Sequence, residues 1–261
     1  MSSFLLTLVR HGTPDAKRRI PKAIGNKDNS LSRKGYCQAD LLGQKLKCEK
    51  FTHIYCSDIT KAKETAVVIA NHNRSCSSLP IHEDPRLEEL RLLDEKEGVE
   101  NINNSLLNKL ETLEDIRHRA EDFFLEICDV MLHRTEQAQS YDAEDDHCES
   151  SSRNSCDVDV IDSASSKDPA NVLVVSHKGL IREMLRYFCS ELGCQLPRRS
   201  GRRVNWDSSY TGMSVFRITV ERTDDLLNNI HVESLLLNDN SHLSKRSNDS
   251  GKLGESPLAT P

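Results

Sequence analysis

The sequence predicts a three-layer α/β/α domain built around a mostly parallel central sheet. Two stretches carry this prediction, residues 4–9 and 171–175, because nearly all of their side chains are apolar. A strand with no polar face is buried on both sides, as strands are in parallel sheets. Apolar residues recur at helical spacing between and after these stretches, which supplies amphipathic helices to cover the sheet.

The first predicted strand, residues 4–9, runs directly into Arg10, His11 and Gly12. Parallel strands deliver the residues that follow them to the carboxyl edge of the sheet, where open α/β folds place their ligands. Arginine offers a planar fork of donors for phosphate oxygens, and an imidazole nitrogen can act as a nucleophile. The tripeptide alone is equally compatible with a structural, hydrogen-bonded histidine.

A loop is predicted over residues 13–30, and Ser32 is the expected N-cap of the helix that follows. The apolar face of that helix is predicted to contain Tyr36, Ala39, Leu42 and Leu46. A short strand over 51–56 leads into a second helix, which buries Ala62, Ala66 and Ile69. Lys61 lies in its first turn, near the positive end of the helix dipole, where anions are favoured.

Two adjacent carboxylates, Glu88 and Glu89, follow a short strand predicted over 79–84. Like charges raise the pKa of a neighbouring carboxyl group, so the pair fits a proton donor. A solvated acidic turn is the alternative. A long amphipathic helix is then predicted from Leu106 to about His133.

The segment 136–168 is rich in serine and acidic residues and is predicted to be a disordered insertion, since it has little apolar surface to bury. The domain resumes in the strand over 171–176, which ends in His177, Lys178 and Gly179. The next helix is predicted to bury Ile181, Leu185, Phe188 and Leu192 and to end at Gly193. Two strands that each end in a histidine at one sheet edge, with Arg10 beside them, predict a phosphate pocket.

An antiparallel pair of strands over 211–220 and 229–237 is expected at the edge of the sheet, followed by a polar tail. The net charge of −6 supplies no basic field, so no nucleic-acid partner is predicted. No apolar run approaches the roughly 18 residues of a membrane span. The nine cysteines lack metal-site or disulfide spacing and are predicted to be reduced thiols in the cytoplasm or nucleus.

The stretch LVRHG, together with the second strand ending in a histidine, resembles the histidine phosphatase superfamily, which includes phosphoglycerate mutases and fructose-2,6-bisphosphatases. The resemblance implies a phosphoglycerate mutase-like domain over 1–243, interrupted at 136–168, and a disordered tail over 244–261. It implies phosphohistidine catalysis with no metal and no cofactor. The implied catalytic residues are His11, Glu89 (or Glu88) and His177, and the implied phosphate-binding residues are Arg10 and Lys61.

Within the family, the stretches KFTHIYCSDITKAKET and TGMSVF are similar to fructose-2,6-bisphosphatases that lower glycolytic flux. This implies a phosphorylated sugar or another small phosphate ester as substrate, in the cytoplasm, with the nucleus and mitochondria as alternatives. Seven positions depart from the family pattern: Lys61 replaces arginine, Lys178 replaces glycine, Lys17 replaces asparagine, Thr13-Pro14 replaces Glu-Thr, and Ala23-Ile24 replaces Gln-Gly. The alternatives are therefore a weakened relative that binds phosphorylated ligands or proteins, and a phosphatase or mutase with another substrate.

Overall fold

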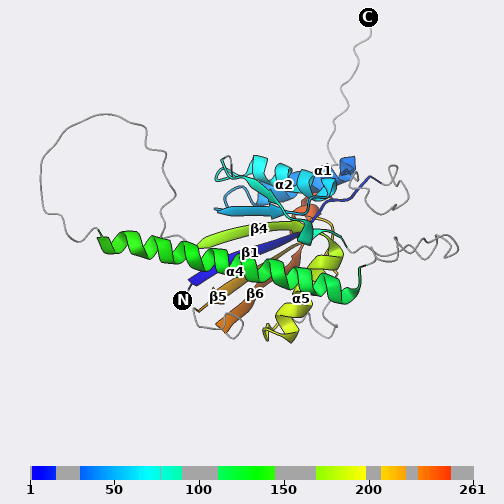
Figure 1. Ribbon diagram of the computed structural model, residues 1–261. Helices are drawn as coiled ribbons and strands as arrows, with labels where there is room; N and C mark the ends of the chain where they lie inside the picture. The colour runs from blue at the N-terminus through cyan, green and yellow to red at the C-terminus, as the bar shows by residue number, and fades with distance from the viewer. Residues whose placement is uncertain are drawn as a thin grey trace, which may run out of the picture.

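The computed structural model describes residues 2–15, 30–76, 78–89, 111–144, 169–197, 207–221 and 229–247. They form one six-stranded sheet with helices on both faces, which confirms the predicted three-layer architecture (Figure 1). The strands are β1 (Ser2–Arg10), β2 (His53–Cys56), β3 (Ile81–Glu83), β4 (Ala170–Ser176), β5 (Met213–Val220) and β6 (Ile230–Asp239). The helices are α1 (Arg33–Lys45), α2 (Thr60–His72), α4 (Leu113–Glu144) and α5 (Lys178–Ser190), with 3₁₀ turns η2 (Pro85–Leu87) and η5 (Ser241–Ser247).

The two predicted apolar strands, β1 and β4, are direct neighbours at the centre of the sheet, which has the order β3-β2-β4-β1-β5-β6. They pair in parallel, with Arg10 opposite Ser176. All seven residues of β4 are buried, as expected for a strand covered on both faces. β2 and β3 extend the parallel part, and β5 and β6 form the expected antiparallel pair. The residues that follow β1 and β4 therefore leave the sheet at one edge.

Helices α1 and α2 cover one face of the sheet. The Ser32 hydroxyl caps α1 as predicted, accepting a hydrogen bond from the Gly35 amide at 3.1 Å. The prediction that Tyr36 is buried is wrong, since 42% of it is exposed. The helix instead packs through small residues, and a Cβ added at Gly43 would lie only 2.7 Å from the His72 ring on α2. Near the start of α1, Gly35 faces the chain that follows β1, and a Cβ there would lie 2.2 Å from the Thr13 carbonyl oxygen. The buried stripe therefore runs through Gly35 and Ala39 and not through Tyr36.

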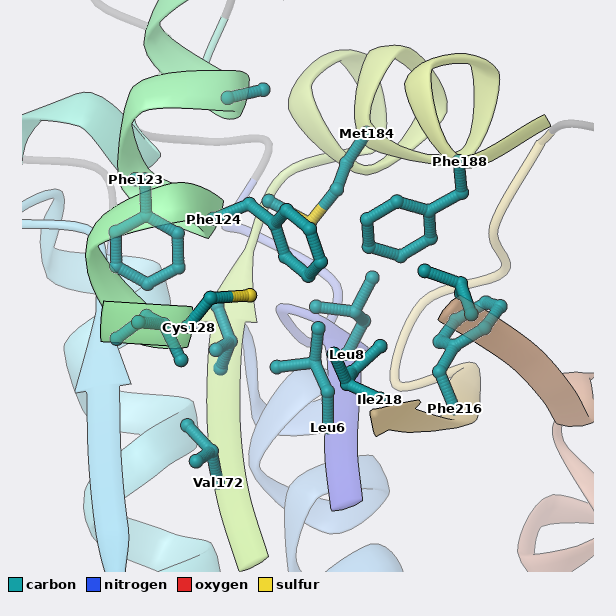
Figure 2. Packing of buried hydrophobic residues seen from close by; sticks show 14 of the residues in the cluster. Leu6, Leu8, Phe123, Phe124, Cys128, Val172, Met184, Phe188, Phe216 and Ile218 are labelled. Atoms are coloured by element: carbon teal, nitrogen blue, oxygen red, sulfur yellow. The ribbon is translucent and has the colours of Figure 1, made fainter. Parts of the chain in front are cut away.

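Helices α4 and α5 cover the other face, where aromatic side chains form the centre of the larger core (Figure 2). The Phe188 ring on α5 lies 4.8 Å from Phe124 on α4 and 5.2 Å from Phe216 on β5, measured between ring centroids. Just beyond α5, the chain turns at Gly193, which has a φ of +65°. Glycine adopts this left-handed conformation without steric cost, so the predicted stop is confirmed.

Helix α4 differs from its prediction at the C-terminal end. The predicted start at Leu106 lies outside the described residues, while the helix continues past His133 to Glu144. It therefore includes the first part of the predicted 136–168 insertion, where glutamine, glutamate and alanine are good helix formers that need no apolar face. Residues 145–168 lie outside the described part, so their disorder stays a prediction. No helix that the structure describes is long and apolar enough to cross a membrane.

The chain after β6 also differs from the predicted tail. The turn η5 extends through Ser247, into the segment 244–261 that was predicted to be disordered. The reason is tertiary: the buried His242 ring places its Nε2 3.0 Å from the Thr211 hydroxyl, beside the end of β1. Residues 248–261 lie outside the described part.

The aromatic core predicts a large effect of truncating Phe124. The Phe124→Ala substitution should lower the free energy of unfolding by about 3–5 kcal/mol, since it opens a cavity between α4 and α5. Urea denaturation followed by circular dichroism measures this change. Val130→Ala on the exposed side of the same helix is the control and should stay within about 0.5 kcal/mol of the unmodified protein. Equal effects of the two substitutions would contradict this account of the core.

Candidate active site

The structure brings the five predicted site residues together at the carboxyl edge of the sheet. Arg10 ends β1 and His11 follows it, and His177 follows β4. Lys61 lies in the first turn of α2, and Glu89 comes two residues after η2. Four separate segments of the chain therefore meet at one place.

The two imidazoles face each other at the centre of the site. The ring centroids of His11 and His177 are 4.9 Å apart, and both side chains are almost completely buried. His11 Nδ1 lies 2.7 Å from the Gly12 carbonyl oxygen. A carbonyl can only accept, so Nδ1 carries the proton and Nε2 keeps a free lone pair. That nitrogen has no hydrogen-bond partner among the described residues.

The backbone around His11 is anchored by residues that the sequence analysis did not assign. The Gly12 amide donates to the Thr65 hydroxyl at 3.1 Å, and that hydroxyl donates to the Lys61 carbonyl at 2.7 Å. His177 Nε2 lies 3.0 Å from the Ser57 hydroxyl. A Cβ at position 12 would lie 2.7 Å from the Gly35 carbonyl oxygen, so only glycine fits there. The sequence feature that could have identified Thr65 is its position one helical turn after Lys61.

Glu89, and not Glu88, is the carboxylate that contacts both imidazoles. Its Oε2 atom lies 3.0 Å from Lys61 Nζ, 3.3 Å from His177 Nδ1 and 3.9 Å from His11 Nε2. One carboxylate oxygen thus lies among two imidazole nitrogens and an ammonium group. These surroundings suit an anionic oxygen.

Burial and mutual contact determine the charges of these groups. Burial lowers the pKa of His11 to about 3, although the neighbouring Glu89 opposes the change. Burial likewise lowers the pKa of His177. For Glu89, burial alone would raise the pKa, but the two histidines and the Lys61 ammonium outweigh it and hold the pKa well below the ordinary value. At neutral pH both imidazoles are therefore neutral and the carboxyl group is ionised.

The Arg10 guanidinium is positioned by the segment before β5. It lies over the Tyr210 ring, 3.9 Å from the ring centroid, and its Nη1 donates to the Ser208 carbonyl at 2.7 Å. Its buried Nε has no hydrogen-bond partner within the described residues. Part of the guanidinium fork is thus left for an anion. Tyr210, which also lies 5.7 Å from the His11 ring, was missed because only the strand after it had a recognisable pattern.

Only some of the other residues that depart from the family pattern lie in the described part of the chain. Lys178 is half-buried and pairs with Asp207 at 2.8 Å. Lys17 lies outside the described residues, as does the basic segment 198–203. The polar atoms of His11, Glu89 and His177 lie within 4.8 Å of one another and are of types that bind metal ions. The Lys61 ammonium beside that carboxylate favours an anion over a cation at this position.

A neutral imidazole with a free lone pair lies beside a carboxyl group, and Lys61 and Arg10 supply positive charge nearby. This arrangement suits the binding of a phosphate ester. The chain belongs to the histidine phosphatase superfamily, branch 1, whose family model matches residues 6–138. It is a phosphatase, and its relatives include proteins named fructose-2,6-bisphosphatase TIGAR.

The relatives agree with this assignment, and solved structures have the same fold. The Bos taurus fructose-2,6-bisphosphatase TIGAR is 32% identical over 85% of this chain and 90% of its own length. The Danio rerio fructose-2,6-bisphosphatase TIGAR B is 28% identical over 95% and 99%. A phosphoglycerate mutase from Bacillus anthracis has the same fold, with a TM-score of 0.55 and 18% identity over 94% of this chain and 96% of its own. A mycobacterial glucosyl-3-phosphoglycerate phosphatase has a TM-score of 0.53, with 19% identity over 90% and 98%.

The buried His11 predicts a loss of stability in acid. In the unfolded chain this imidazole takes up a proton below a pH of 6.5, whereas the folded protein binds that proton only near 3. The unfolded state binds more protons between these values, so stability falls as the pH decreases. From pH 7 to pH 5, the burial of neutral His11 should lower the free energy of unfolding by roughly 2 kcal/mol.

Urea denaturation of the His11→Gln variant at pH 7 and pH 5 measures this contribution, which the variant should lack. The matched control is His118→Gln on the exposed face of α4, which should keep the full pH dependence. An unchanged pH dependence in His11→Gln would contradict the buried, neutral state of this imidazole.

Lys61 provides a second test of the site. Lysine gives a single ammonium, whereas arginine would hold phosphoryl oxygens with two parallel hydrogen bonds. The Lys61→Arg substitution should therefore raise kcat by about fivefold, which corresponds to roughly 1 kcal/mol. Steady-state kinetics checks this, with Lys63→Arg, which pairs with Glu83, as the control. Unchanged or lower activity of Lys61→Arg would show that Lys61 does not hold the phosphoryl group.

Proposed function

We propose that this phosphatase hydrolyses the 2-phosphate of fructose 2,6-bisphosphate through a phosphohistidine on His11, and so lowers glycolytic flux. The observation that carries the mechanism is the free Nε2 lone pair of a neutral, buried His11 beside Glu89 and His177. The substrate rests on the relatives named fructose-2,6-bisphosphatase. The seven described cysteines are free thiols, which suits the reducing cytoplasm that we propose as its location.

In the first step His11 Nε2 attacks phosphorus in line with the bond to the sugar oxygen. The new P–N bond forms as the P–O bond breaks, and the sugar leaves as an alkoxide that needs a proton. Glu89 supplies that proton. Its pKa is low in the free site because Lys61 and the two imidazoles surround the carboxylate. Phosphoryl oxygens that take over these partners, and add negative charge, raise that pKa, so Glu89 takes up a proton as substrate binds.

In the second step water attacks the phosphohistidine. Glu89, now ionised, accepts a proton from the water, the P–N bond breaks, and His11 regains its neutral lone pair as phosphate leaves. Throughout both steps, Arg10, Lys61 and His177 place positive charge or hydrogen-bond donors against the phosphoryl oxygens. No covalent bond to His177 is involved.

Labelling tests the mechanism and the substrate together. Fructose 2,6-bisphosphate that carries ³²P at position 2 is mixed with the protein and quenched in alkali. We expect an acid-labile label on wild-type protein and none on His11→Ala, together with release of inorganic phosphate and fructose 6-phosphate. A panel of other sugar phosphates and phosphoglycerates should be turned over at least about tenfold more slowly.

The other outcomes separate the alternatives. No label and no phosphate release with any member of the panel would contradict the enzyme proposal and support a relative that only binds phosphorylated ligands. Label that passes to a second sugar or phosphoglycerate in preference to water would identify a mutase. Faster turnover of another member of the panel would contradict fructose 2,6-bisphosphate as the substrate.

A further inference from the structure

The main chain that carries Glu89 is held by an arginine from α4. Arg119 Nη1 donates to the carbonyl oxygens of Arg86, at 2.5 Å, and Glu88, at 2.8 Å, and Nη2 lies 3.4 Å from the Glu89 carbonyl oxygen. On its other side, the guanidinium binds both carboxylate oxygens of Glu111. The side chains of Arg119 and Glu111 are only 15% and 14% exposed. The ion pair is therefore largely shielded from water.

The remaining carbonyl in this turn is also bound. The Leu87 carbonyl accepts a hydrogen bond from the Ser176 hydroxyl at 2.7 Å, and Ser176 directly precedes His177. The Arg86 side chain extends back to α4, where it pairs with Glu126 at 2.7 Å and lies over the Phe123 ring. The turn is thus fixed to α4 from one side and to the strand that carries His177 from the other.

This arrangement matters most when substrate is bound. In the free site the Glu89 carboxylate is located by Lys61 and the two imidazoles. During the reaction those groups bind the phosphoryl oxygens, so the carboxyl group loses the contacts that locate it. Only its main chain then determines whether it reaches the leaving oxygen. Arg119 binds that main chain but touches none of the reacting groups.

We propose that Arg119 is a positioning residue for the proton donor Glu89. Three carbonyl oxygens and a bidentate carboxylate around one side chain require the planar, five-donor fork of arginine. Lysine at this position keeps the charge but loses the fork, so the Glu89 main chain shifts. A misplacement of about 1 Å costs roughly 100-fold in rate. The inference rests on the proposed role of Glu89 in the phosphatase reaction.

The test compares two leaving groups. Expulsion of a sugar alkoxide needs the Glu89 proton, whereas expulsion of 2,4-dinitrophenolate does not, because that anion is stable without one. The ratio kcat/KM reports only the steps up to release of the leaving group, before water attacks the phosphohistidine. We expect Arg119→Lys to lower kcat/KM for fructose 2,6-bisphosphate by about 30- to 100-fold. For 2,4-dinitrophenyl phosphate the loss should be less than about threefold.

Three variants calibrate this comparison. Glu89→Gln should show the same selective loss and sets its upper limit. Arg117→Lys, two residues from Arg119 on α4 and paired with Glu114 at the surface, should change neither rate. Glu111→Gln leaves the main-chain contacts of Arg119 in place and should show a smaller loss with the same selectivity. It also provides the test if Arg119→Lys does not fold by circular dichroism.

Equal losses with both leaving groups in Arg119→Lys and Glu111→Gln would overturn the proposal and show a general structural role. Unchanged kcat/KM of Arg119→Lys for both leaving groups would overturn the proposal as well. If wild-type protein hydrolyses another alkyl phosphate but not fructose 2,6-bisphosphate, the proposed substrate is wrong, and the same comparison on that alkyl phosphate still decides the role of Arg119. If it hydrolyses only aryl phosphates, both proposals are wrong.

Discussion

The parallel, in-register pairing of β1 with β4 is the constraint on which the rest of the structure depends. Arg10 lies opposite Ser176, so the next residue of each strand is a histidine at the same edge of the sheet. The strands are far apart in the sequence, and only their hydrogen-bonded register places the two rings 4.9 Å apart. A shift of one residue would turn one imidazole to the opposite face of the sheet. The pairing of two apolar strands thereby fixes the positions of the two histidines.

Burial of the side chains at the ends of β1 and β4 determines their protonation states. An exposed imidazole would titrate near neutral pH, but burial keeps His11 neutral, and its Nε2 lone pair stays free. In the same site the Lys61 ammonium pairs with one carboxylate oxygen of Glu89. The free site is therefore complementary to an anionic oxygen before substrate arrives. This complementarity links stability to function, because the desolvated groups that prepare the site also make the fold sensitive to acid.

The parts of the fold that were predictable are those governed by local patterns. Ser32 caps its helix and Gly193 ends another because capping and left-handed turns depend on a few neighbouring residues. Tyr36 shows the limit of this reasoning, since the close contact between Gly35 and Thr13 places Gly35, and not Tyr36, in the buried stripe of α1. The order after β6 likewise depends on a distant contact, between His242 and Thr211, which has no local signature.

For the site, the residue pattern was enough to predict the types of group present: two histidines and an arginine after buried strands, a lysine at a helix start, and a pair of glutamates. Tertiary structure decided which glutamate faces the imidazoles and which residues support them. Arg119 and Tyr210 act through contacts with segments remote in sequence, the Glu89 turn and Arg10. The physical reason is that main-chain carbonyls and ring faces, which every segment offers, leave no mark in the residue pattern until folding brings a particular partner to them.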